Sequence, residues 1–510
     1  MSIELTSRSI GMGEIYYDNF VEQGVDCDVT LPDYCPDIMR IIKCTVSNSI
    51  TNSKLIGDRA TADGNAKIRL IYADDKNNVC CYDQDYPFSK YAELSSAYDN
   101  AFLSCTAKTE YVNCRAVSKR RVDIHGIVSI HFRVIGNSKT SLVSDACGDG
   151  IQLKRKGIDI DDIVSVATKT FEVSQVENVG DTNSGIGKVL DVFCSPVLNE
   201  SKIIKGKILL KGEMYVRVLY CADTPDSGPC TLCCNLPFNE VVESADVNDE
   251  CRLDVKMHVT RMSAEPKTDN DGEYRYMNIN TEIAAQVTSY TKQSIRVVTD
   301  AYSTDTEIDT KYTPMQLTQI CSSFRESVIC KQSLDVSSMS PQKLYAFTIS
   351  APDGKCCADN GKLILSGKVP VSLIVIDSDG TPILCEREAE FEYSKVIDDT
   401  TGVYCNPQMC IGGCSATLTG DGKVDFKAEI FLTATVFRNV NEKVLTTLET
   451  CDGVPKKDKK SAVIIYFCSG GESIWDIARR YNTTVEEIML ENDLSADYLE
   501  NKRMLLIPVK

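Results

Sequence analysis

A repeat with a period of about 150 residues constrains the fold of this chain more than any other feature of its sequence. Residues 64–72, 212–220 and 367–375 each begin with glycine and then alternate apolar side chains with others. Such alternation is typical of a strand with one face on a core and the other in solvent. A glycine at one shared position predicts a bulge or a close crossing of the backbone there. We therefore expect three copies of one β unit.

Two further marks recur in the same order in every unit. A second alternating strand is predicted at residues 122–132, 277–287 and 424–434. Between the two strands lies one aromatic marker per unit, which is Phe88, Phe238 or Phe391. These marks predict a mainly β fold of three tandem antiparallel, sandwich-like modules.

Turn residues predict how the strands are connected. Asp-Gly pairs favour tight hairpins, and they occur at Asp271-Gly272, Asp379-Gly380 and Asp421-Gly422. Pro36 and Pro314 stand near the start of the first and third units, where a proline can open a short helix. The second unit lacks that proline, and its segment 158–166 is a poorer match.

The repeat also suggests where the domains begin and end. We expect the first module to span residues 1–150, the second 151–303 and the third 304–451. A polar, Lys-rich segment, 452–461, follows them and has the composition of a flexible tether, although it could also dock an acidic partner. Residues 462–510 form the last domain.

The last domain shows a β-α-α-β pattern. Residues 463–468 are β-rich, Gly470-Gly471 ends that run, and Ser473 can cap a helix. A capping box formed by Thr483 with Glu486, or by Thr484 with Glu487, predicts a second helix, and residues 504–508 a closing strand. We expect Trp475, the only tryptophan of the chain, to pack in the core.

Composition disfavours several classes of function. The 510 residues carry a net charge of −18, which repels nucleic acid and anionic lipid. No apolar run is long enough to span a bilayer, and no signal-peptide core is present, so we expect a cytoplasmic protein that does not span a membrane. The 24 cysteines are then mostly reduced thiols.

Candidate catalytic and metal-binding motifs are weak. The segment 180–189 resembles a phosphate loop but lacks its spacing and its Ser or Thr. His125 and His131 fall on the polar face of a strand, as solvated residues would. Adjacent cysteine pairs such as Cys80-Cys81 point to opposite faces, so we expect small buried hydrophobes rather than zinc ligands. We predict no catalytic residues, no metal and no cofactor; oxidative cross-linking through the abundant thiols is a separate hypothesis.

Two segments resemble known families. The sequence DCDVTLPDYCPDIMRII, followed by the β repeats, resembles the SPOCS modules of spore-coat morphogenetic proteins. Residues 463–510 are similar to a LysM domain of the βααβ type. Together they resemble the SPOCS-plus-LysM, SipL-like proteins of the spore coat.

The LysM resemblance implies a binding groove for a chain of N-acetylglucosamine. Its two loops would be formed by Gly470, Gly471, Glu472, Ser473 and Ile474 on one side, and by Asn492, Leu494 and Ser495 on the other. LysM domains commonly have Gly-Asp-Thr-Leu at the first loop, whereas this chain has Gly-Glu-Ser-Ile at residues 471–474.

The resemblance implies a scaffold rather than an enzyme. In the coat proteins the module faces the mother-cell cytosol at the forespore surface, where it contacts other coat proteins. The expected partners are the ATP-hydrolysing basement-layer protein and other coat proteins, retained by several modules at once. The alternative is a cell-envelope protein whose LysM domain binds peptidoglycan or its lipid-linked precursor.

Overall fold

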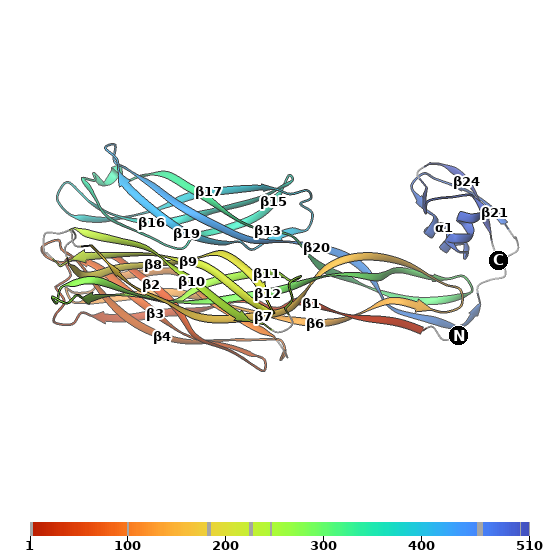
Figure 1. Cartoon of the computed structure of the whole chain (residues 1–510), viewed down its shortest axis with the longest axis horizontal. Coiled ribbons are helices and arrows are strands. Elements are labelled where there is room, and N and C mark those ends of the chain that lie inside the picture. Colours follow the sequence, from red (N-terminus) through yellow and green to blue (C-terminus); the bar gives the residue numbers. More distant parts are fainter. Residues whose placement is uncertain are drawn as a thin grey trace.

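The structure, a computed structural model, describes residues 4–98, 101–180, 185–223, 228–244, 247–455, 463–499 and 501–508. Antiparallel strands dominate it. They form three successive two-sheet units and end in a small domain with two helices (Figure 1). No helix in these ranges is long and apolar enough to cross a membrane.

Unit 1 is a sandwich of two three-stranded sheets. One sheet has the order β1-β6-β5 and the other β2-β3-β4, with a shared core between them. Alternate residues of its strands are buried, for example Ile68 and Leu70 facing Val122 and Ile124. The strands are β1 (Glu4–Thr30), β2 (Arg40–Ile56), β3 (Arg59–Ala73), β4 (Val79–Glu93), β5 (Phe102–Ala116) and β6 (Arg121–Cys147).

Unit 2 repeats this topology. Its sheets have the orders β11-β12-β7 and β10-β9-β8, again around one core. The strands are β7 (Ile151–Asn178), β8 (Ile186–Ile204), β9 (Lys207–Ala222), β10 (Pro229–Glu243), β11 (Arg252–Thr268) and β12 (Tyr274–Ser303).

Unit 3 repeats it once more, with two of its strands interrupted. β14 (Lys343–Ile349) and β15 (Asp353–Asp359) share one edge of β16 (Lys362–Ile376), and β17 (Pro382–Val396) takes the other. The second sheet contains β13 (Thr306–Asp335), β20 (Lys423–Pro455), β18 (Val403–Cys405) and β19 (Gln408–Leu418). The predicted fold class, three tandem antiparallel β modules, is confirmed.

The shared glycine lies directly opposite the aromatic marker in each unit. Gly64 pairs with Phe88, Gly212 with Phe238 and Gly367 with Phe391. A Cβ atom on any of these glycines would lie within 2.7 Å of both the ring and a carbonyl oxygen of the neighbouring strand. The ring therefore covers the glycine closely, and the neighbouring strand shows a bulge there in units 1 and 2 and an interruption in unit 3.

The first and last strands of each unit continue beyond the sandwich as a two-stranded ribbon (Figure 1). A register shift marks the same point in all three units, near Tyr17, Ile163 and Ile320. The three ribbons then pack against one another through apolar side chains from β6, β7, β12, β13 and β20. We call this joint stem the trunk.

The three sandwiches also meet directly, through an apolar cluster contributed by equivalent positions. Ile42, Leu190 and Tyr345 occupy the same bulge in β2, β8 and β14, and Ile71, Leu219 and Ile374 come from β3, β9 and β16. Because each unit supplies the same strands, the units are related by an approximate threefold axis through this cluster. We call it the axial cluster.

Charged residues adjoin the axial cluster. Lys43 and Asp191 follow Ile42 and Leu190 at equivalent positions, opposite Ile71 and Leu219, and Ala346 takes the third position, opposite Ile374. Lys43 Nζ donates to Thr348 Oγ1 and Ser372 Oγ, both at 2.9 Å. Burial lowers the pKa of Lys43 and raises the pKa of Asp191. Neighbouring groups of opposite charge partly offset both shifts.

Two arginines complete this network at equivalent positions of β3 and β9. Arg69 forms a two-point ion pair with Asp83, at 2.7 and 2.6 Å. Arg217 is only 2% exposed, and its guanidinium stacks on the Phe347 ring with its carbon 3.9 Å from the centroid. The three units thus contribute different side chains to one shared polar contact.

Three local predictions were wrong or lie partly outside the described residues. No helix starts at Pro36, which lies in an irregular segment, or at Pro314, which lies within the edge strand β13, and edge strands are where sheets tolerate proline. β20 extends to Pro455, so 452–455 of the expected tether belong to a strand. Residues 456–461, with their lysines, lie outside the described residues.

The predicted domain boundaries remain predictions. The divisions after residues 150 and 303 fall in the short connections between β6 and β7 and between β12 and β13. The three Asp-Gly pairs lie in hairpin connections as predicted, and in each pair only the glycine has a positive φ.

Candidate functional site

The C-terminal domain holds the sequence-predicted site. β21 (Val463–Cys468) pairs with β24 (Arg503–Pro508), and the short β22 (Glu472–Ser473) pairs with β23 (Tyr498–Leu499). Helices α1 (Ile474–Tyr481) and α2 (Val485–Glu491) cover one face of the larger sheet. Ser473 is the N-cap residue of α1, but its side chain makes no capping hydrogen bond. Thr484 caps α2 as predicted, since its hydroxyl accepts the Glu487 N–H at 3.1 Å.

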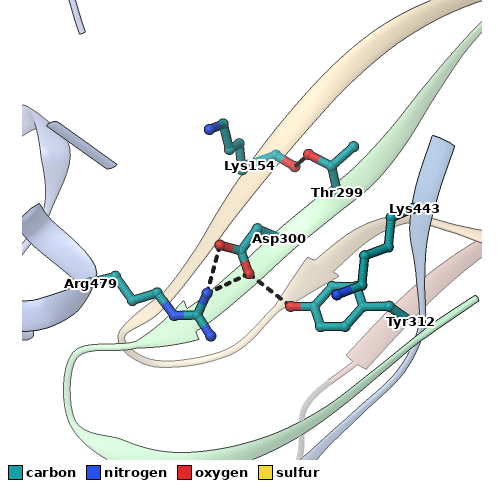
Figure 2. Close-up of a pocket in the computed structure, with 6 residues that line it drawn as sticks. All are labelled: Lys154, Thr299, Asp300, Tyr312, Lys443 and Arg479. Carbon is teal, nitrogen blue, oxygen red and sulfur yellow. Dashed lines mark hydrogen bonds and ion pairs between the residues drawn. The ribbon is translucent and has the colours of Figure 1, made fainter. Parts of the chain in front are cut away.

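Helix α1 docks this domain onto the trunk through one aspartate. Asp300, near the end of β12, accepts a hydrogen bond from Trp475 Nε1 at 2.8 Å. It also accepts from Arg479 Nη1 at 2.9 Å and from the Tyr312 hydroxyl at 2.8 Å (Figure 2). The first two donors belong to the C-terminal domain and the third to β13. One carboxylate therefore joins the domain to two strands of the trunk.

An aromatic contact adjoins this aspartate. The Tyr302 ring meets Trp475 edge to face with centroids 4.9 Å apart, and its hydroxyl donates to the Thr483 carbonyl at 2.7 Å. Burial, with a smaller effect of Asp300, raises the pKa of Tyr302, so the hydroxyl remains a donor. Trp475 is buried as predicted, but it packs partly against the trunk and not only within its own domain.

A polar cavity of about 390 Å³ opens beside the junction. It is lined by Lys154, Thr299, Asp300, Tyr312, Lys443 and Arg479 (Figure 2). Lys443 lies over the Tyr312 ring, with Nζ 4.6 Å from its centroid. Three basic side chains, from Lys154, Lys443 and Arg479, line the cavity. Its one carboxylate, that of Asp300, already accepts hydrogen bonds from three side chains.

The first predicted groove loop contains the short strand β22, and the second precedes its partner β23 in the chain. Gly470, Gly471 and Ser495 are exposed, Glu472, Ser473, Asn492 and Leu494 are half-buried, and Ile474 is buried. The Gly471 N–H donates to the Leu499 carbonyl at 2.7 Å, and the Ile474 N–H to the Asp497 carbonyl at 2.9 Å. Both of these amides are already bonded within the domain.

Two of the predicted groove side chains also have internal partners. Glu472 accepts the Tyr466 hydroxyl and the Ser469 N–H, one on each oxygen and both at 2.9 Å. Asn492 donates to the carbonyls of Ile488 and Leu506 and accepts the Leu506 N–H, which ties the end of α2 to β24. A sugar would have to compete with these bonds.

The outer face of the larger sheet is apolar and exposed. Val463, Ile465 and Phe467 alternate along β21, and Met504 lies opposite Phe467 on β24. Phe467 is 75% exposed and Ile465 59%. The intervening residues of these strands face the helices instead. We call the four exposed side chains the outer apolar face.

The other candidate motifs are not assembled into a site. His125 pairs with Asp26 and His131 with Asp18 on an accessible face of unit 1. The described residues contain no group of three or more His, Cys, Asp or Glu side chains placed to hold a metal ion. In segment 180–189, which resembles a phosphate loop, residues 181–184 lie outside the described residues.

Comparison with protein families gives two matches. Residues 37–117 and 185–267 match the family described as SipL, SPOCS domain, and residues 470–508 match the LysM domain. The chain has the SPOCS-plus-LysM architecture. The SPOCS matches cover β2 to β5 in unit 1 and β8 to most of β11 in unit 2, and the LysM match covers the docked C-terminal domain. No curated protein and no solved structure matches the chain.

SPOCS and LysM are binding domains without catalytic activity. Sequence reasoning found the LysM domain and its tryptophan but missed the docking site on the trunk. Asp300, Tyr302 and Tyr312 belong to no periodic or spaced motif, and they lie more than 150 residues from α1 in the chain. The single tryptophan of the chain was the only signal in the sequence that could have pointed to this contact.

Proposed function

We propose that this chain is a non-enzymatic scaffold of sporulating cells that tethers basement-layer coat proteins at the forespore surface. The SPOCS and LysM matches support a sporulation-associated binding protein. The proposed location is the mother-cell side of the forespore surface, in the cytoplasm and later in the coat. The partners are the ATP-hydrolysing protein of the basement layer and other coat proteins.

The observation that carries this proposal is the state of the LysM surface. Several polar groups at the predicted groove, from Gly471, Glu472, Ile474 and Asn492, are bonded within the domain. The outer apolar face, by contrast, exposes four large side chains side by side. Exposed apolar clusters of this kind are typical of protein interfaces, whereas sugars need free polar partners.

A glycan ligand is the second candidate. LysM domains suggest glycan binding. Gly470 and Ser495 are exposed at the rims of the predicted groove, where small residues leave room for a sugar ring. In this alternative the chain would bind peptidoglycan or its precursor through that groove.

The two candidates are separated with two variants of the full chain. Ile465→Ser with Phe467→Ser removes most of the outer apolar face, and Ser495→Trp fills the rim of the groove. We expect the first variant to lose at least tenfold in affinity for the purified basement-layer ATPase. The second should bind that ATPase like the wild-type chain. Binding is measured by surface plasmon resonance, and retention on purified peptidoglycan in parallel.

Ile56→Ser with Val396→Ser is the control, because both residues are exposed apolar side chains far from the LysM domain. Wild-type retention on peptidoglycan that Ser495→Trp abolishes, without measurable ATPase binding, would reverse the order of the two candidates.

A further inference from the structure

Two cysteines in unit 1 face each other across the two sheets. Cys44 lies on β2 opposite Leu70, and Cys114 lies on β5 opposite Ile124. Leu70 and Ile124 are both buried in the unit 1 core, and residues directly opposite on paired strands point to the same side. Both thiols therefore point into the sandwich, where they pack against that core and hydrogen-bond to each other.

Unit 3 contains a second pair with the same relation. Cys356 lies on β15 opposite Leu365, and Cys405 on β18 opposite Val436. Leu365 and Val436 are fully buried in the unit 3 core. The two thiols are half-buried and hydrogen-bond to each other as well.

Both pairs occupy the seam of a sandwich. β2 and β5 are edge strands of the two sheets of unit 1, and β15 and β18 are edge strands of the two sheets of unit 3. The facing strands pack against each other but belong to different sheets, so no ladder of backbone hydrogen bonds joins them. A covalent bond at this place would fix one sheet to the other.

The chemistry of the pairs suits thiol–disulfide exchange. Within each pair one thiol donates to the other, which lowers the pKa of Cys114 and of Cys356, while the hydrogen bond and burial raise the pKa of Cys44 and of Cys405. A lowered pKa enriches the thiolate, which is the attacking species. Unit 2 carries Val192 and Ala264 at the positions equivalent to Cys44 and Cys114, so its seam lacks this pair.

We propose that Cys44–Cys114 and Cys356–Cys405 are redox-active dithiols that staple the sheets of units 1 and 3 when the protein meets an oxidising disulfide. In each pair one thiolate attacks a small-molecule disulfide, such as oxidised glutathione, and expels one glutathione thiolate. The second cysteine then attacks the mixed disulfide and releases the other. Two protein thiols are oxidised, one disulfide is reduced, and two molecules of glutathione leave.

The experiment is a redox titration of the reduced full chain with oxidised glutathione. Samples are quenched with acid, alkylated and digested, and the peptides are mapped by mass spectrometry. We expect these two intramolecular disulfides to form before any other pairing of the 24 cysteines. The midpoint of thermal unfolding should rise by several degrees and return to its starting value with dithiothreitol.

Single substitutions test the pairing. Cys44→Ser and Cys356→Ser should each remove one of the two disulfides and its part of the thermal shift. Cys357→Ser and Cys80→Ser are the controls, because Cys357 adjoins Cys356 on the opposite face and Cys80 lies half-buried elsewhere in unit 1. Stable glutathione adducts at the four cysteines, disulfides between chains, or earlier oxidation of other pairs in the wild-type map would each overturn the proposal.

Discussion

The glycine opposite each aromatic marker shows how one residue type is required at one position of the repeat. At Gly212 a side chain would occupy space held by the Val197 carbonyl oxygen, 2.2 Å from the built Cβ, and by the Phe238 ring, 2.5 Å away. The carbonyl is part of the backbone and cannot rotate away. The glycine is therefore needed for space and not for a positive φ.

Gly212→Ala should destabilise the protein by about 2 kcal/mol, because overpacking of a filled site forces the strand and the ring apart. The measurement is the midpoint of urea unfolding. Gly157→Ala is the matched control, since nothing lies within 4 Å of a Cβ atom on that strand glycine. Equal stabilities of the two variants would contradict this packing account.

At the scale of single residues, the features that depend on local spacing could be predicted from the sequence. Glycines 64, 212 and 367, their aromatic partners and the Thr484 cap all depend on local spacing, which is visible without a structure. Pro314 misled the prediction, because an edge strand tolerates proline as well as a helix start does. Which strand is at an edge depends on tertiary pairing, and spacing carries no information about it.

At the scale of elements, the junction of α1 with β12 and β13 fixes how the LysM domain is held. The contact depends on Asp300, which accepts from Trp475, Arg479 and Tyr312. No sequence pattern predicted this contact. Helix α1 and the first part of β12 were predicted from periodicity, whereas β13 was not, since a helix start was expected at Pro314. The contact depends on one carboxylate whose partners are remote in the chain.

Asp300→Asn should release the LysM domain from the trunk. The amide has one acceptor oxygen in place of two and no charge, so it cannot serve all three donors, a loss of about 2 kcal/mol. Because Trp475 is the only tryptophan, its fluorescence reports this change directly. We expect emission to shift to longer wavelength and acrylamide quenching to increase.

Asp309→Asn serves as the control for that substitution, since Asp309 is exposed on β13 and carries the same charge. Unchanged fluorescence in Asp300→Asn, together with normal folding by circular dichroism, would mean that the aromatic contact of Tyr302 holds the domain without the carboxylate.

At the scale of the whole molecule, the axial network joins the three sandwiches. Asp191 lies among the cations Lys43, Arg69 and Arg217, which come from units 1 and 2. The repeat in the sequence predicted three equivalent units but not their contact. The equivalent positions carry lysine, aspartate and alanine, and in the sequence alone such a set is typical of a variable surface position.

Asp191→Ala should lower the stability of the full chain by about 3 kcal/mol, because it leaves enclosed cations without their shared counter-charge. Adding Lys43→Met should recover part of that loss, since one of those cations is then gone. Differential scanning calorimetry gives the comparison, with the exposed Asp398→Ala as control. A double variant less stable than Asp191→Ala alone would show that the two charges do not compensate each other.

The trunk changes what several binding modules on one chain can achieve. Modules on slack linkers adjust to almost any spacing of their targets, whereas modules locked in one stem present their surfaces at set separations and angles. Such a molecule is selective for geometry. It would bind tightly to a regularly ordered array whose repeat distance matches the spacing of its modules, and only weakly to the same targets when they are scattered.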